Sequence, residues 1–199
     1  MTAYRNFTVD FPARIEKLDD LFAPLAASHD LEVTYLLMKA ASAFLLPYER
    51  MFGDSGVRKH DVLDPQKART QLELDKKFLR SSYCSTWNEW RWYSVNDFSK
   101  GPLDWFQHEQ GISTWEVGSI LKVVRHALAH SNLYFGGENS VIQHIYFGNR
   151  ADANKQTDQY RVIRGSIKDV QQMLETWLDR VQLLRGSSSL VWQAIDEAA

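Results

Sequence analysis

One stretch near the middle of the chain, residues 113 to 132, most constrains the fold. It reads STWEVGSILKVVRHALAHSN. Apolar residues recur in it at steps of four, three and four, the spacing of one face of an α-helix: Val117, Leu121, Val124 and Leu128. We therefore expect a helix with one face against the core. Ser113 and Glu116 have the spacing of a capping box, which predicts that the helix begins there.

The neighbouring faces of this predicted helix carry basic side chains beside small ones. Gly118, Lys122 and Arg125 share one row, and His126 and His130 share the next. Small residues let another group approach closely, so this surface suits a second helix or a phosphate. The helix dipole also favours cations near a C-terminus, so ordinary capping is the alternative explanation.

The segment from Arg125 to His130, Arg-His-Ala-Leu-Ala-His, resembles the R-(N/D/H)-x-x-x-H motif of the HEPN superfamily. These compact helical domains occur in many prokaryotic toxin and defence systems. The resemblance covers about residues 11 to 185. It implies a mainly α fold, an antiparallel helical bundle with a small β-hairpin between the motif helix and the last long helix. We expect one HEPN-like domain over residues 1–185 and a tail or short helix over 186–199.

The resemblance also implies an activity, metal-independent endoribonuclease cleavage through attack of the RNA 2′-OH at a dimer interface. Arg125, which stays charged and can bind two phosphate oxygens, would stabilise the transition state. His130 can exchange protons near neutral pH and is the candidate general acid/base. His126 stands where the family often has asparagine and is a third catalytic candidate. The expected role is in defence, stress or a toxin-like system.

Residues around the motif add expectations about RNA and partners. Lys122, Asn132 and Tyr134 are candidate RNA-binding residues. Arg125 and His130 are five apart, about 140° around a helix, which favours a site completed by a second copy of the chain. We therefore expect a homodimer that binds RNA, with an antitoxin-like or regulatory protein as a further possible partner. Some HEPN toxins are silenced by modification of a tyrosine at the position where this chain has Asn132. The asparagine puts this kind of control in doubt here.

A second hypothesis comes from another class of protein. Many HEPN domains serve as binding or dimerisation modules, so this chain is alternatively a non-catalytic module for a nucleotide, an RNA or a protein. Residues 83 to 93 hold a dense aromatic cluster: Tyr83, Trp87, Trp90, Trp92 and Tyr93. Such rings stack on bases in single-stranded RNA. They also dominate cores and dimer interfaces, which is the commoner use.

The sequence offers little for metals or cofactors, and we expect neither. His126 and His130 have the spacing of two metal ligands on one helix face. Ala127, however, stands where the HExxH motif has its glutamate. Cys84 is the single cysteine of the chain, which excludes an internal disulfide and a cysteine-built zinc site.

Charge and hydropathy limit which classes of protein the chain can belong to. The formal net charge is -2 and the isoelectric point about 6.3, so RNA contacts must come from a local basic patch. The first residues, MTAYRNFTVDF, have no apolar leader, and the most apolar run is too short to cross a bilayer. We expect a cytoplasmic protein without a membrane partner.

Periodicity and turn residues predict the other elements. Helices are expected over 11–27, 31–52, 64–82 and 167–184, and a short tail helix over 190–198. Asp10, Asp30 and Ser166 are the expected caps, and Pro47 is expected to kink or end its helix. Residues 1–10 are expected as a loose lead-in, or as a short strand over residues 7–9. Two strands, 141–147 and 160–164, alternate in polarity and are expected to pair as an antiparallel hairpin. Residues 96–111 are expected to form a loop with a short helical turn around residues 103–106.

Overall fold

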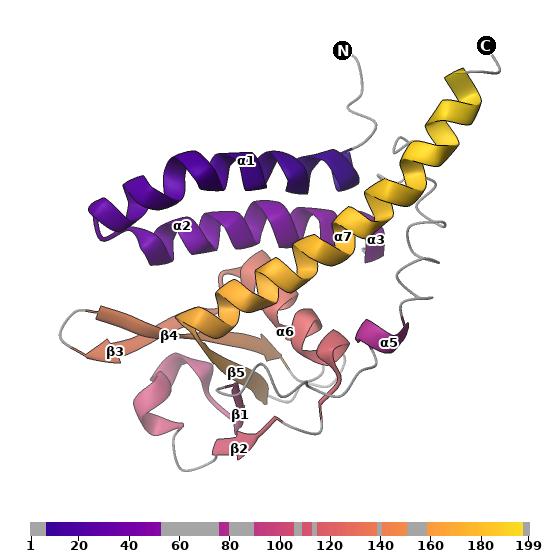
Figure 1. Cartoon of the computed structure of the whole chain (residues 1–199). Helices are drawn as coiled ribbons and strands as arrows, with labels where there is room; N and C mark the ends of the chain where they lie inside the picture. The colour runs from indigo at the N-terminus through magenta and orange to yellow at the C-terminus, as the bar shows by residue number, and fades with distance from the viewer. Residues whose placement is uncertain are drawn as a thin grey trace. The chain divides into compact units, whose positions relative to one another are not determined.

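The computed structural model describes residues 7–52, 76–79, 90–105, 109–112, 115–138, 141–150 and 159–196. The chain divides into two compact units (Figure 1). The helical unit comprises residues 1–74 together with 174–199, and the sheet unit comprises residues 75–173. The helical unit is thus discontinuous in sequence, whereas the sheet unit is one uninterrupted segment.

The helical unit begins with α1 (Phe7–Ser28), so the lead-in or strand predicted at residues 7–9 is wrong. Asp30 follows α1 with a left-handed φ of 55°, and the N–H of Leu31 donates to the Ala26 carbonyl at 2.8 Å. Leu31 is the N-cap of the next helix and has no side-chain cap bond. Asp30 therefore closes the turn after α1, and the prediction that it caps the second helix is wrong.

The second predicted helix is present as three consecutive segments. These are α2 (Glu32–Lys39), the π-helix η1 (Ala40–Leu45) and α3 (Leu46–Phe52). The helix does not end at Pro47; its distortion takes the form of the π segment just before that residue. Proline has no N–H to donate to the carbonyl of Ala43 four residues earlier. The indole Nε1 of Trp177 donates to that carbonyl instead, at 3.0 Å.

Trp177 belongs to the last helix, α7 (Ile167–Asp196). Its ring is fully buried and meets Phe44 edge-on, with 5.2 Å between centroids. Nearby, Ile15, Ala43 and Leu178 form a small apolar core of the helical unit. α7 is continuous to Asp196, so the predicted end near Arg185 and the separate tail helix are wrong.

The sheet unit corrects the predicted fold class. Its described residues contain five antiparallel strands in the order β2-β1-β5-β4-β3 (Figure 1). Their bounds are β1 Arg91–Val95, β2 Glu109–Gly111, β3 Leu133–Glu138, β4 Val141–Arg150 and β5 Tyr160–Ser166. The predicted antiparallel pairing of β4 with β5 is confirmed. The fold is nevertheless mixed α/β, and not a helical bundle with a small hairpin.

The start of α7 is set by a reciprocal cap that the sequence predicted in part. Ser166 ends β5, and its Oγ accepts a hydrogen bond from the Asp169 N–H at 3.1 Å. The Asp169 carboxylate accepts in return from the Ser166 N–H at 3.2 Å and from its hydroxyl at 2.7 Å. Because these bonds satisfy donors at the helix start, Ser166 caps α7 as expected.

The motif helix, α6 (Val117–His130), packs on β4 and β5. Its apolar face is buried through Val117, Leu121 and Val124, as the periodicity predicted. The helix begins three residues later than the predicted capping box implies. Glu116 is the N-cap without a side-chain cap bond, so it does not act as the N3 residue of a capping box, and Ser113 lies outside the described residues.

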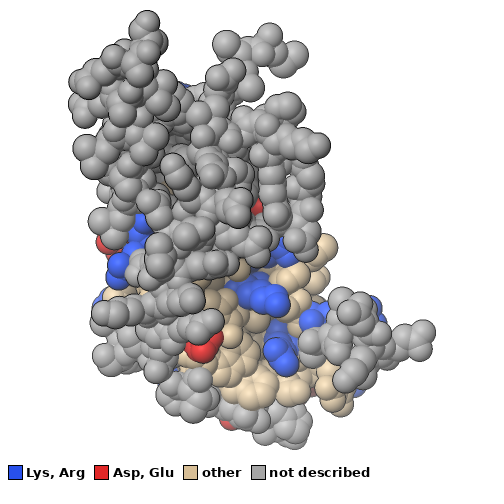
Figure 2. Space-filling model, turned by 90° about the vertical axis from the view of Figure 1, so that its right-hand side faces the viewer, with Lys and Arg blue, Asp and Glu red and all other residues tan. Residues whose placement is uncertain are grey.

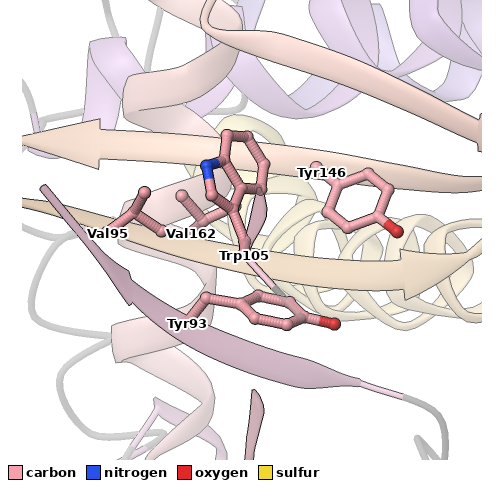
Figure 3. Close-up of a cluster of buried hydrophobic side chains, with 5 residues drawn as sticks. All are labelled: Tyr93, Val95, Trp105, Tyr146 and Val162. Atoms are coloured by element: carbon pink, nitrogen blue, oxygen red, sulfur yellow. The ribbon is translucent and has the colours of Figure 1, made fainter. Parts of the chain in front are cut away.

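The core of the sheet unit is aromatic (Figure 3). Tyr93 and Val95 from β1, Tyr146 from β4, Val162 from β5 and Trp105 form one buried cluster. Trp90 is fully buried and lies 6.1 Å from the Phe147 ring, so packing is confirmed for that ring. Of the remaining aromatic-rich segment, Tyr83 and Trp87 lie outside the described residues. So does most of the predicted helix 64–82, apart from α5 (Lys76–Leu79).

Candidate functional site

The last turns of α6 bring together the three catalytic candidates. The Arg125 Nη1 lies 3.1 Å from Nδ1 and 3.3 Å from Nε2 of His126. The rings of His126 and His130 are 6.3 Å apart between centroids and 11° from parallel. His126 therefore stands between the other two side chains, and the three form one continuous row on the helix surface. We call this set the motif row.

The motif row has different surroundings along its length. Arg125 and His126 are half-buried, whereas His130 is exposed. The Arg125 Nη1 is almost equally distant from the two ring nitrogens of His126, so the guanidinium lies close against that imidazole. The exposed imidazole of His130 is open to solvent and to a ligand.

The predicted RNA-binding residues have different positions. Lys122 is exposed one turn before His126, on the same side of α6, and adds a second cation beside the motif row. Asn132 lies beyond the helix, where its N–H donates to the Ala127 carbonyl at 2.9 Å. Its own carbonyl accepts from the Gly148 N–H at 2.9 Å. These bonds fix the end of α6 to β4.

Tyr134, the third predicted RNA-binding residue, packs against other aromatic rings. Its hydroxyl donates to the Ser99 carbonyl at 3.1 Å. Its ring meets Phe98 and Trp105 edge-on at 5.0 and 5.4 Å. Tyr134 is thus held by the aromatic side of the sheet unit, where it lines a hollow.

This hollow, which the sequence reasoning missed, has a volume of about 590 Å³. Its walls come from three separate parts of the chain: Asn96, Asp97, Phe98 and Ser99, then Ser131, Leu133 and Tyr134, and finally Tyr160. Ser131 follows His130 directly, so the hollow lies next to the end of the motif helix. The only local signal in the sequence was a polar-aromatic run in a segment predicted as loop.

Asp97 supplies a carboxylate to the wall of the hollow. Its Oδ1 accepts hydrogen bonds from the Ser99 N–H at 3.0 Å and from the Ser99 hydroxyl at 2.6 Å. The bonds from Ser99 hold the pKa of Asp97 below its ordinary value. The carboxylate is therefore charged at neutral pH.

A second polar cluster braces one edge of the sheet. Glu109 on β2 accepts from the Tyr93 hydroxyl at 2.7 Å, and its carboxylate lies 3.2 Å from Arg91 Nε and 3.6 Å from Arg164 Nη1. Burial and the bond to Glu109 raise the pKa of Tyr93 well above its ordinary value. The cluster joins β1, β2 and β5, which gives it a structural use.

Basic side chains outnumber acidic ones in the described part of the sheet unit, although the whole chain has a net charge of -2. Figure 2 shows Lys and Arg side chains gathered among the described residues of one face.

Within the described ranges, no cluster of three or more His, Cys, Asp or Glu could hold a metal ion. No helix in the same ranges is long and apolar enough to span a membrane.

The comparisons with known proteins give one match. No curated protein and no solved structure matches the chain. The model of one protein family, described as HEPN pEK499 p136, matches residues 1–182. This match spans most of the chain and includes the whole of α6 with its motif row. The chain therefore belongs to the HEPN pEK499 p136 family.

Proposed function

We propose that this HEPN protein is a metal-independent endoribonuclease whose site is built from the motif row. The observation that carries the proposal is the continuous contact from Arg125 through His126 to His130 on the exposed end of α6. A cation and an exposed imidazole at the same end of one helix are two groups that cleavage of a phosphodiester can use. Family membership adds support, because the matched residues 1–182 include the whole motif row.

The chemistry follows from the groups in the row. His130 accepts the proton of the 2′-OH, and the resulting oxygen attacks the adjacent phosphorus. Arg125 donates to the phosphate oxygens as negative charge develops on them. The P–O5′ bond breaks, the 5′ oxygen takes up a proton, and a 2′,3′-cyclic phosphate remains on the other fragment. His126 orients the guanidinium, and Lys122 attracts the neighbouring phosphate.

A second copy of the chain supplies the other half of the reaction in this proposal. One imidazole cannot both accept the 2′-OH proton and protonate the leaving oxygen in the same step. Two motif rows facing each other would provide a base from one subunit and an acid from the other. An antitoxin-like or regulatory partner that covered the exposed His130 would silence the enzyme, which fits a defence, stress or toxin-like role.

The test is cleavage of a mixed single-stranded RNA in excess EDTA. Arg125→Ala and His130→Ala should each lose at least about 100-fold in rate, the usual contribution of one acid/base or charge-stabilising group. His29→Ala and Arg161→Ala, which remove exposed side chains of the same types elsewhere, are the matched controls. Wild-type rates for both motif variants would disprove the site, and loss of wild-type cleavage in EDTA would disprove metal independence.

The hollow supports a second candidate function, a HEPN module that binds a nucleotide or RNA without cleaving it. Its aromatic wall offers a ligand site that does not depend on turnover. This alternative predicts RNA binding by wild type and by His130→Ala with equal affinity, and no cleavage by either. A fluorescent RNA in an anisotropy titration, run beside the cleavage assay, separates the two functions.

A further inference from the structure

We propose that the hollow beside α6 holds one nucleobase of the RNA and that Asp97 selects a base with paired N–H donors, guanine above the others. This inference rests on the ribonuclease function proposed above, because it places the base next to the reacting phosphate. Nothing in the family match assigns the hollow a ligand.

The size and walls of the hollow suit a flat aromatic ligand. Its volume of about 590 Å³ falls in the range of small-molecule sites. Phe98, Tyr134 and Tyr160 are each half-buried, so part of every ring is open to the hollow side or to solvent. The Phe98 ring is nearly parallel to Tyr160, at 5.4 Å and 20°. Phe98 also stacks on Trp105, at 5.2 Å and 13°, so its faces are occupied by protein rings and it supports Tyr160 from behind. Tyr134 and Tyr160 are therefore the rings that could stack on a base of single-stranded RNA.

The charge of the walls favours a base and disfavours a phosphate. Asp97 is the one charged residue among the described residues that line the hollow, and neither Lys nor Arg is among them. A charged carboxylate repels phosphate oxygens and attracts N–H donors. Ser99 uses only Oδ1 of Asp97, which leaves Oδ2 outside those two hydrogen bonds.

Guanine presents the best match to this carboxylate. Its N1–H and 2-amino group lie side by side and can donate to one carboxylate together. Adenine and cytosine offer an amino group beside an acceptor nitrogen, and uracil offers an N–H between two carbonyls, which the carboxylate repels. Inosine, which differs from guanosine by the missing 2-amino group, isolates the contribution of the second donor.

The position of the hollow connects base binding to the motif row. Ser131 lines the hollow, and its Cα is about 3.8 Å from that of His130, the distance between consecutive residues. Ser131 is in the left-handed conformation, and the hydrogen bonds of Asn132 to Ala127 and Gly148 hold this turn in place. A base in the hollow would therefore bring its adjoining phosphate to the end of α6.

The first experiment measures nucleoside binding to the folded His130→Ala protein by amide chemical shifts in NMR. Uncharged nucleosides are the probes, because they exclude a contribution from phosphate. Guanosine should shift the amides of Ser99 and Ser131 and should bind at least tenfold more tightly than uridine, with inosine between them. Asp97→Asn should remove this preference. Asp104→Asn, an exposed carboxylate outside the hollow, is the matched control.

A second readout separates this inference from the proposed activity. Fragment ends from RNA cut by wild type and by Asp97→Asn are mapped by sequencing, and guanine enrichment beside the cut should vanish in the variant. Guanosine shifts without any RNA cleavage would support the hollow and overturn the ribonuclease. RNA cleavage with equal shifts for guanosine and uridine, or with no shifts at Ser99 and Ser131, would overturn the hollow alone.

Discussion

Pro47 removes one hydrogen-bond donor from its helix, and Trp177, which is distant in the sequence, supplies another. Pro47 cannot donate to the Ala43 carbonyl, and the buried indole N–H of Trp177 does so across 134 residues of sequence. A buried carbonyl without a partner is costly, typically by about 1–3 kcal/mol. The pair therefore allows a proline inside a buried helix at little cost.

Trp177→Phe should lower the free energy of unfolding by about 1–3 kcal/mol, since it leaves the Ala43 carbonyl without its donor. Urea denaturation provides the measurement, with Trp92→Phe as a control at a half-buried tryptophan of the sheet unit. Pro47→Ala restores a backbone N–H, so Trp177→Phe should cost less in that background. An equal cost in both backgrounds would show that lost packing, and not the carbonyl, is responsible.

At the scale of single elements, local signals predicted the long helices and the β4–β5 pair but missed the shorter strands β1, β2 and β3. α6, the β4–β5 pair and the start of α7 were foreseen because their periodicity and cap residues lie within one short stretch. β2 has three residues, and β3 contains Gly136 and Gly137, so neither shows a strand pattern. Gly137 is itself required, because a Cβ there would lie 1.8 Å from the Val141 carbonyl oxygen.

Local sequence could likewise predict only one part of the candidate site. The motif row was predictable because Arg125, His126 and His130 belong to one helix, whose spacing fixes their neighbours. The hollow was not, because strand pairing and the turn at Ser131 bring its three segments together. Those contacts depend on tertiary structure that no local pattern encodes. Tyr134 was named for RNA binding from its place after the motif, and the structure puts it in the hollow.

The polar cluster around Glu109 gives a prediction about how the stability of the sheet unit depends on pH. Because the pKa of Tyr93 is raised, the folded protein keeps a proton that the unfolded chain releases above pH 10. This stabilisation is complete below pH 10 and is lost as the pH rises further. Between pH 8 and pH 11, the free energy of unfolding of Tyr93→Phe should therefore fall by about 1 kcal/mol less than that of wild type.

Urea unfolding of the two proteins at both pH values measures this difference. Ser94→Ala, at an exposed position on the same strand, is the control and should follow the wild-type dependence. Parallel losses in wild type and Tyr93→Phe would show that Tyr93 does not contribute to alkaline unfolding.

At the scale of the whole molecule, the helical unit exposes an apolar face. Leu21, Leu25 and Met38 are 69%, 52% and 64% exposed, and Phe22 lies among them on α1. The lining of a largely apolar groove between α1 and α2 includes Leu25, Phe22 and Met38. Large exposed apolar patches on proteins in water mark association surfaces. The homodimer that we propose for catalysis gives this face an occupant, a second copy of the chain.

Leu25→Glu should weaken self-association at least tenfold, because it places a charge on the face that association would bury. Light scattering over a range of protein concentrations measures the dissociation constant. Leu103→Glu is the matched control, since Leu103 is 87% exposed in the sheet unit, on the 3₁₀ turn η4 (Pro102–Asp104). Equal dissociation constants for the two variants would exclude this face as the dimer contact.

The discontinuous helical unit has a consequence for synthesis on the ribosome. The sheet unit, residues 75–173, has left the peptidyl transferase centre before any of residues 174–199 exists. Domains tend to fold as soon as their sequence is complete. The first part of the helical unit, residues 1–74, is therefore made well before Trp177, and the Ala43 carbonyl waits for its donor until α7 has been synthesised. The helical unit can close only after the whole sheet unit has been made.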